Sequence, residues 1–399
     1  MSDPNNASEF VASMQRVQAW IEQHHYKGYE PFDGLNSFLR PLTFGTVLGE
    51  QLLQQVGRQS PINLRPLLGV KPQESTKGRG YVAWGHLLQY AATGKQDHCR
   101  IAEECLDWLD QHKSKLYTKH SWGNAFDYAS RGGKIPRDEP TIVWTSLIGQ
   151  AFLEAYEQTR NERWLKIADS ICEWIVDLPR EETSKGTCLS YVVYTQSSIH
   201  NSNMLGSAML ARTAKHTGNA DYRRLAQASM EYSINGQLPD GAWYYGEDPK
   251  YHWIDNFHTG YNLDSLKRYI VHSGDETWNE NLRRGFAYFK AHFVEADGCP
   301  RYYHNRRQPI DIQGAAQVID TLTFFSDTDP SSLDVAASVA RWTIKYMQDA
   351  DGHFYYRRYP LITAKAPMIH WGQATMFKAL AHLAAKLETA QKTSARHVI

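Results

Sequence analysis

The sequence predicts an all-α fold in which six helical hairpins close into a double ring, an (α/α)6 toroid. Three observations predict it: a unit that recurs about every 57 residues, six segments rich in small residues, and six amphipathic segments between them. A fixed period of this length indicates a repeat architecture, in which each unit buries its apolar face only against its neighbours.

The clearest trace of the repeat is an acidic turn followed by aromatic residues. Its Asp-Gly pairs stand 57 and 54 residues apart, a spacing that separate loops would not share. The copies are Asp240-Gly241 before Trp243-Tyr244-Tyr245, Asp297-Gly298 before Tyr302-Tyr303, and Asp351-Gly352 before Tyr355-Tyr356.

The chain is expected to form one domain over 1–399, because no Pro/Ser/Gly-rich linker divides it. Residues 1–78 are predicted to hold an amphipathic helix over 8–25, an extra helix over 41–57 and, between them, a loop that lies over the barrel mouth. Residues 79–390 hold the repeats, and 391–399 are expected to be a frayed tail.

Six segments predict an inner ring. Each joins a polar or aromatic start to a helix of small and apolar residues, which let neighbouring helices approach closely. Several end at Gly94, Gly218 or Gly274, as a helix C-terminus favours. The segments begin near Arg79, Glu139, Ser198, Asp255, Asp311 and Met368.

The segments between them predict an outer ring. In 97–112, Ile101, Cys105, Trp108 and Leu109 fall at i, i+4, i+7 and i+8, which makes one apolar stripe. The outer set is 8–25, 97–112, 162–177, 221–235, 277–293 and 331–347. Strand signals are few; we expect 191–194 and the tyrosine pairs to form short strands or hairpins in loops.

Composition argues against several classes of protein. Lys+Arg and Asp+Glu are both 43 without a long run of one sign, so nucleic acid is not an expected partner. No apolar stretch is long enough for a membrane span and no signal peptide is visible. The five cysteines are an odd number without a CxxC pair, which predicts reduced thiols in a cytoplasmic protein and no metal site. No phosphate loop, GxSxG or HExxH pattern occurs, so no cofactor is expected.

Two segments carry a resemblance to a known family. Residues 253–263, which read WIDNFHTGYNL, and residues 29–37, which read YEPFDGLNS, resemble bacterial exopolysaccharide-biosynthesis proteins named for the Vibrio biofilm cluster. These lie within the six-hairpin (α/α)6 toroid superfamily. The resemblance implies sugar or uronic acid substrates and hydrolase, lyase or epimerase activity, but it assigns no catalytic residue.

A second resemblance concerns one copy of the repeat. Gln237, Asp240-Gly241 and Trp243 have the spacing of the QW motif of terpene cyclases. The aspartate-rich DxDD motif of those enzymes is missing, and Asp327-Thr-Asp329 is only a weak echo of it. Terpenoid cyclisation is therefore the less favoured alternative.

The candidate catalytic residues lie at the starts of inner helices. Asp255 and His258 stand three apart, which places a carboxylate beside an imidazole. Asp311 and Glu139 take corresponding places in two other repeats, and Asp33 lies in the mouth loop. Two carboxylates across a sugar are what glycosidic cleavage requires. The alternative for each aspartate or glutamate is a helix cap, a first-turn acid or a turn residue.

The candidate binding residues are aromatic or polar. Aromatic rings stack on sugar faces, and histidine side chains supply hydrogen-bonding groups. Arginine pairs with a carboxylate through two hydrogen bonds. Structural packing and solvated surface charge are the alternatives. The set comprises Trp243, Tyr245, Trp253, Tyr261, Tyr303, Trp371, His200 and Arg79.

Together these patterns favour a carbohydrate-active protein of bacterial exopolysaccharide metabolism. It would cleave or epimerise an oligosaccharide or polysaccharide in an aromatic, acid-lined cleft at the barrel mouth. The rival from another class is a non-catalytic glycan-binding or scaffold protein. The sequence leaves the glycan, the reaction type and the oligomeric state open.

Overall fold

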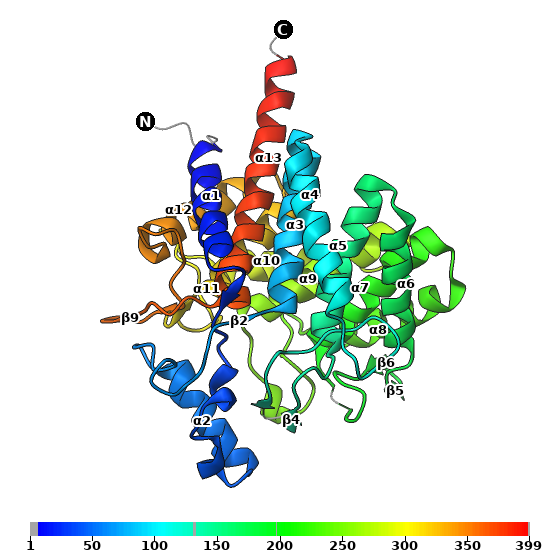
Figure 1. Ribbon diagram of the computed structural model, residues 1–399. Helices are drawn as coiled ribbons and strands as arrows, with labels where there is room; N and C mark the ends of the chain where they lie inside the picture. Colours follow the sequence, from blue (N-terminus) through cyan, green and yellow to red (C-terminus); the bar gives the residue numbers. More distant parts are fainter. Residues whose placement is uncertain (1–6, 131–132, 197, 398–399) are drawn as a thin grey trace.

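A computed structural model describes residues 7–130, 133–196 and 198–397, and its helices form two concentric rings. Figure 1 views them from the side. Each inner helix contacts the next, and the last contacts the first, so the inner ring is closed. This arrangement confirms the predicted toroid. The inner helices are α3 (Thr76–Thr93), α5 (Ile142–Thr159), α7 (His200–Thr217), α9 (Asn256–Ser273), α11 (Ile312–Phe324) and α13 (Thr375–His397).

Each helix of the outer ring packs chiefly against one inner helix, and most of them also contact the next inner helix. Helix α1 comes from the N-terminus and packs against α13 at the other end of the chain, so the sixth hairpin joins both ends. The outer helices are α1 (Ser8–Gln23), α4 (Gln96–Gln111), α6 (Glu162–Val176), α8 (Ala220–Ile234), α10 (Asn279–Phe293) and α12 (Ser331–Met347).

Small residues allow the inner helices to pack closely, as predicted. A Cβ atom on Gly149 of α5 would lie 2.6 Å from Met209 Sδ of α7, and one on Gly85 of α3 would lie 2.7 Å from Phe377 of α13. The inner helices are buried on nearly all sides because they contact both the ring and the outer shell.

The helix ends follow the predicted signals. Gly94, Gly218 and Gly274 have φ of 69°, 75° and 74° and end α3, α7 and α9 in the left-handed conformation. Asp255 caps the N-terminus of α9, where its side chain accepts the backbone N–H of His258.

The repeated Asp-Gly turn joins one repeat to the next. The carboxylates of Asp240, Asp297 and Asp351 each accept the backbone N–H two residues later. The glycines have φ of 97°, 83° and 101°, and each packs against the backbone of the next outer helix. A Cβ on Gly241 would lie 2.5 Å from the Arg284 carbonyl oxygen of α10. The repeated Asp-Gly pair therefore has a structural role, since it packs each link against the next outer helix.

Short antiparallel strands occupy the links. At residues 191–194 the structure has a single bridge, Val192 with Thr195, in place of the predicted strand. The paired strands are β1 (Lys27–Gly28) with β2 (Gln73–Glu74), β3 (Tyr128–Ser130) with β4 (Gly133–Ile135), β5 (Arg180–Thr183) with β6 (Gly186–Leu189), and β7 (Ile310–Asp311) with β8 (Arg357–Arg358) and β9 (Thr363–Ala364).

The N-terminal region forms an arm over the barrel mouth. Residues 38–67, which we call the arm, contain η2 (Arg40–Thr43) and α2 (Val47–Gln59), and they extend below the rings in Figure 1. The loop before the arm includes the short helix η1 (Asp33–Asn36), and two further short helices are η3 (Pro249–Tyr251) and the π-helical η4 (Ile369–Ala374).

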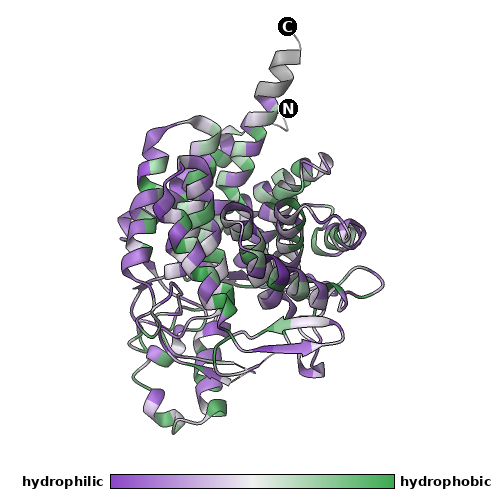
Figure 2. Ribbon diagram, turned by 90° about the vertical axis from the view of Figure 1, so that its right-hand side faces the viewer, coloured by the Kyte–Doolittle hydropathy of each residue, from purple (hydrophilic) through white to green (hydrophobic). Residues whose placement is uncertain are grey.

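At the other end of the chain, α13 continues to His397, so most of the expected tail is helical; residues 398 and 399 lie outside the described residues. Among the helices of the described residues, none has the length and hydropathy of a membrane span. Figure 2 shows apolar segments within the rings and again on the arm at the bottom of the view. All five cysteines are buried as free thiols.

Candidate active site

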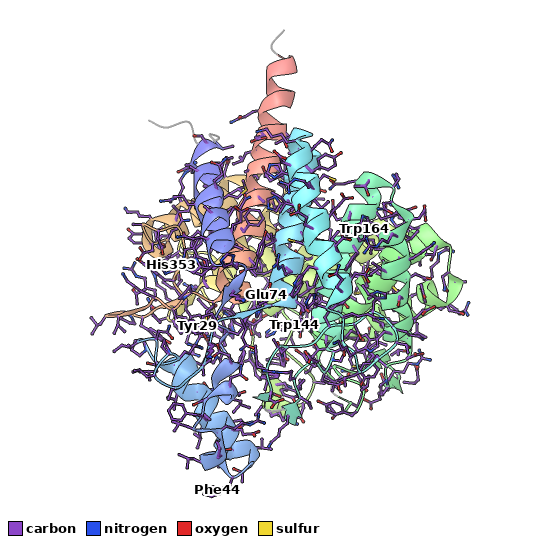
Figure 3. All side chains as sticks on the ribbon, viewed as in Figure 1. Tyr29, Phe44, Glu74, Trp144, Trp164 and His353 are labelled. Carbon is purple, nitrogen blue, oxygen red and sulfur yellow. The ribbon has the colours of Figure 1, made fainter. Side chains whose placement is uncertain are left out.

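A cleft of about 910 Å³ lies at the barrel mouth. Its walls come from the links before the inner helices and from one face of α2. In Figure 3, Tyr29, Glu74 and Trp144 mark the level of the mouth, and Phe44 marks the far tip of the arm. The predicted residues that line the cleft are Asp255, His258, Tyr245, Trp253, Tyr303 and Trp371.

Asp255 and His258 form a dyad in the cleft. His258 Nδ1 lies 2.7 Å from Asp255 Oδ2, and Trp253 Nε1 donates to the same oxygen at 3.0 Å. The other oxygen, Oδ1, accepts the His258 backbone N–H at 3.0 Å. Since the carboxylate holds Nδ1, the imidazole presents Nε2 to the cleft as the atom that can accept or deliver a proton.

Aromatic rings surround the dyad. Tyr245 stacks on Trp253 with ring centroids 4.5 Å apart and an interplanar angle of 15°, and its ring lies 4.5 Å from that of His258. Phe257 contacts Trp371 edge to face. Burial raises the pKa of Tyr245 well above its ordinary value, so this phenol stays protonated and can donate a hydrogen bond.

Arg58 is a functional candidate that the sequence did not reveal. It projects from α2 into the cleft, and its guanidinium lies 4.7 Å from the centre of the Phe32 ring. Throughout the described ranges it has no ion-pair partner within 4.0 Å. A guanidinium that forms no ion pair inside the chain's described part suits a carboxylate ligand in an aromatic cleft. Arg306, at the rim, stacks on Tyr303 at 4.3 Å.

The three other predicted carboxylates do not line the cleft. Asp311 is buried, pairs with Arg357 at 2.5 Å, and accepts Trp371 Nε1 at 2.8 Å. Asp33 is buried against Arg65 at 2.7 Å, and burial raises its pKa to about 6 although Arg65 opposes the shift. Glu139 accepts the Tyr117 hydroxyl at 2.9 Å, and burial raises its pKa. This corrects the expected ring of carboxylates around one cavity.

Three predicted binding residues also point elsewhere. Trp243 lies in the hydrophobic core, where its indole N–H donates to the Ser233 carbonyl at 2.8 Å. His200 is buried beside Glu247 at 3.3 Å. Arg79 pairs with Glu74 at 2.7 Å and stacks on Tyr26. In each case packing, or a partner inside the chain, occupies the side chain that the sequence assigned to substrate.

Tyr261 belongs to a second polar layer inside the barrel. Its hydroxyl lies 3.0 Å from that of Tyr81 and accepts Gln313 Nε2 at 2.8 Å. Lys77 Nζ lies 3.4 Å from the same oxygen, and burial lowers the pKa of Lys77 to about 7. His370 lies beside Glu30 at 2.5 Å.

The cleft favours proton transfer over hydrolysis by two carboxylates. Within the part of the chain that the structure describes, Asp255 is the one aspartate or glutamate in the cleft lining, and both its oxygens are engaged. Glycosidic hydrolysis ordinarily uses a pair of such groups. The polar tips among the rings also disfavour a terpenoid cavity, which would be apolar.

Comparisons with known proteins identify the fold. No family model matches the chain, and no curated protein matches it. Among solved structures it is similar to a GH76 α-mannanase from Bacteroides thetaiotaomicron, with a TM-score of 0.61, 12% identity, and coverage of 80% of this chain and 88% of that one. A polysaccharide lyase matches with a TM-score of 0.60 and 13% identity over 97% of this chain and 98% of that one.

A third similar structure is cellobiose 2-epimerase from Bacillus thermoamylovorans, with a TM-score of 0.58, 10% identity, and coverage of 78% of this chain and 90% of that one. These identities are low, so the three structures share the toroid with this chain, and its function must come from its own site.

Proposed function

We propose that this protein processes a uronate-containing glycan by removing a proton from carbon, in a lyase or epimerase reaction of bacterial exopolysaccharide metabolism. One observation carries the proposal: the His258–Asp255 dyad and Arg58, which has no ion-pair partner among the described residues, open into the same aromatic cleft. The glycan-processing activities named for the similar structures support it, and so do the family-like segments 29–37 and 253–263. The cytoplasm is the proposed compartment.

In this reaction each residue of the cleft has a separate role. His258 Nε2 takes the C5 proton of the uronate, and Asp255 holds the imidazole and stabilises its charged form. The electron pair moves into the uronate carboxyl group, whose growing charge Arg58 stabilises. The pair then either expels the C4 oxygen, which leaves a C4=C5 double bond, or takes up a proton from solvent on the other face of C5.

The remaining aromatic residues bind and position the sugar. Trp253, Tyr245, Tyr303 and Trp371 supply ring faces and edges. Tyr245 is the proposed donor to the departing oxygen, since it lines the cleft with its ring 4.5 Å from that of His258. Asp311 acts through Trp371, whose indole N–H it accepts, and is proposed as a positioning residue.

Discrimination between acidic and neutral glycans tests the proposal. Affinity and product formation would be measured for uronate oligosaccharides and for matched neutral ones, with the wild type, Arg58→Gln and Arg284→Gln. Arg284 lies on α10 outside the cleft lining and serves as the matched control. We expect the wild type and R284Q to prefer the acidic ligands and R58Q to lose the preference. Equal binding of both ligand sets by the wild type would contradict the proposal.

The second candidate function is a non-catalytic glycan-binding protein. One observation favours it: the carboxylate in the cleft already serves as a helix cap. It predicts tight binding of acidic oligosaccharides without any product, and no change of the bound sugar when His258 is replaced.

A further inference from the structure

The arm carries an apolar surface that faces solvent. Nine of the fifteen exposed large apolar side chains in the described residues lie within 38–67. Scattered apolar side chains are ordinary on a protein surface, but a concentrated patch marks an interaction site. Phe44, at the tip of the arm, is 87% exposed.

Helix α2 buries a polar face and exposes an apolar one, the reverse of an ordinary surface helix. Its buried residues include Glu50 and Gln54, whereas Leu48, Leu52 and Val56 are 67%, 61% and 49% exposed. These three stand at i, i+4 and i+8 and form one outward stripe. A surface helix usually buries its apolar stripe and exposes its polar one.

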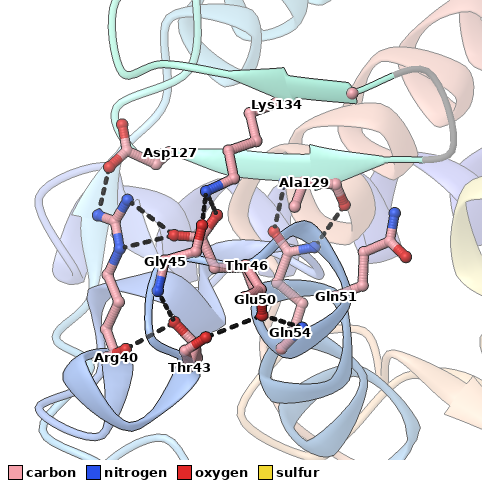
Figure 4. A network of polar contacts seen from close by, with 12 residues as sticks. Arg40, Thr43, Gly45, Thr46, Glu50, Gln51, Gln54, Asp127, Ala129 and Lys134 are labelled. Atoms are coloured by element: carbon pink, nitrogen blue, oxygen red, sulfur yellow. Dashed lines mark hydrogen bonds and ion pairs between the residues drawn. The ribbon is translucent and has the colours of Figure 1, made fainter.

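The polar face of α2 fixes this orientation (Figure 4). Gln54 forms two hydrogen bonds with the backbone of Ala129, at 2.7 and 2.9 Å. Gln51 Nε2 donates to the Ser130 carbonyl at 2.6 Å, and Glu50 pairs with Lys134 at 2.8 Å. Because these contacts root the helix on the β3–β4 hairpin, its apolar stripe is held outward in a defined position.

The stripe continues into the cleft. The residues of α2 that line it are Leu48, Gln51, Leu52, Gln55, Arg58 and Gln59, which share one helix face. Along this face the character changes from aliphatic at the outer end to amide and guanidinium groups at the inner end. Arg58 lies over Phe32, whose ring contacts Trp371 edge to face at 6.1 Å.

We propose that the substrate is amphiphilic: a glycolipid whose acidic sugar occupies the aromatic part of the cleft while its hydrocarbon chain lies along Leu48 and Leu52. The inference rests on the proposed function and names the substrate class of the same site. Continuity of the stripe with the cleft favours one molecule that spans both. A purely polar oligosaccharide would leave Leu48 and Leu52 in water.

Alkyl glucuronides test this directly. The affinity of the full chain for methyl, butyl and octyl β-glucuronide would be measured by calorimetry, below the concentrations at which they form micelles. We expect binding to tighten about two- to fourfold for each added methylene, since full burial of one methylene contributes about 0.8 kcal/mol. The slope should vanish in a Leu48→Gln/Leu52→Gln variant and persist in Leu361→Gln, a fully exposed leucine between β8 and β9.

Several results would overturn the inference. These are equal affinity for the three glucuronides, a slope that survives in L48Q/L52Q, or a self-association in the wild type that the double variant abolishes. Capture on phosphatidylcholine–phosphatidylglycerol vesicles without any chain-length slope would also overturn it, in favour of membrane docking. If soluble uronate oligosaccharides are converted but affinity does not rise with alkyl chain length, only the glycolipid is refuted. If affinity rises with chain length but uronate oligosaccharides are not converted, only the proposed reaction is refuted.

Discussion

At the scale of single residues, Asp255 has two roles that substitution can separate. Asparagine is as good a helix cap as aspartate, but it has no charge to hold an imidazolium. We expect Asp255→Asn to lower kcat on an acidic glycan by roughly 10²–10⁴-fold while α9 stays folded. Asp255→Ala should lose about as much activity and, in addition, about 1 kcal/mol of unfolding free energy through the lost cap. Steady-state kinetics and urea unfolding check both; full activity in D255N would remove the dyad from the mechanism.

For Asp311, substitution by asparagine should reduce stability more than activity, the reverse of the expectation for Asp255. Replacing it with asparagine leaves the buried Arg357 without its carboxylate, and breaking a buried pair typically costs about 3–5 kcal/mol. We expect Asp311→Asn to lower the free energy of unfolding by that amount. Below its melting temperature, the variant should keep most of its kcat, because the asparagine Oδ1 can still accept the indole N–H of Trp371. A collapse of kcat at unchanged stability would instead mark Asp311 as catalytic.

At the scale of elements, the Asp-Gly turns should behave as joints between repeats. Gly241 and Gly274 both have positive φ, but a Cβ on Gly241 would meet the Arg284 carbonyl oxygen at 2.5 Å, whereas one on Gly274 meets open space. Gly274→Ala should cost about 1–2 kcal/mol through backbone strain alone. Gly241→Ala should cost about 2 kcal/mol more through overpacking. If both variants lose the same free energy of unfolding in denaturant titrations, the turn at Gly241 does not pack against α10.

Glu247 provides an element-scale test of pH dependence. It lies in the link before α9; hydrogen bonds from His200 and Lys185 hold its pKa at about 2, below the ordinary value of 4.5. A lowered carboxyl pKa stabilises the fold above the unfolded-state pKa, and this contribution is lost as the pH falls. The stability difference between wild type and Glu247→Gln should therefore be full above about pH 5 and shrink between about pH 4.5 and 2. A difference independent of pH in urea titrations would contradict this pairing.

At the scale of the whole molecule, the sequence predicts the rings better than the site. Small-residue helices, glycine ends and amphipathic partners are local patterns, so both rings were predictable. The Asp-Gly period was also visible, although it marks a joint. Asp255 with His258 was predictable because the two side chains lie one helical turn apart.

Contacts between distant parts of the chain explain what the sequence missed. Arg58 enters the cleft because α2 is anchored to a distant hairpin, for example through Gln54 and Ala129, which stand 75 residues apart. Asp311 is occupied by Arg357, which lies 46 residues further along. Trp243 and Tyr245 are two apart, yet one enters the core and the other the cleft, and their sequence neighbourhood does not decide which.

Isotope labelling distinguishes removal of a proton from carbon, with His258 as the proposed base, from hydrolysis. The protein would be incubated with acidic oligosaccharides in heavy water and, separately, in oxygen-18 water. The masses of the products would then be measured by mass spectrometry. We expect either a deuterium atom at C5 of an intact chain or shorter products with an unsaturated end, and no solvent oxygen in either case. Shorter saturated products that carry oxygen-18 would establish hydrolysis and exclude proton removal from carbon as the reaction.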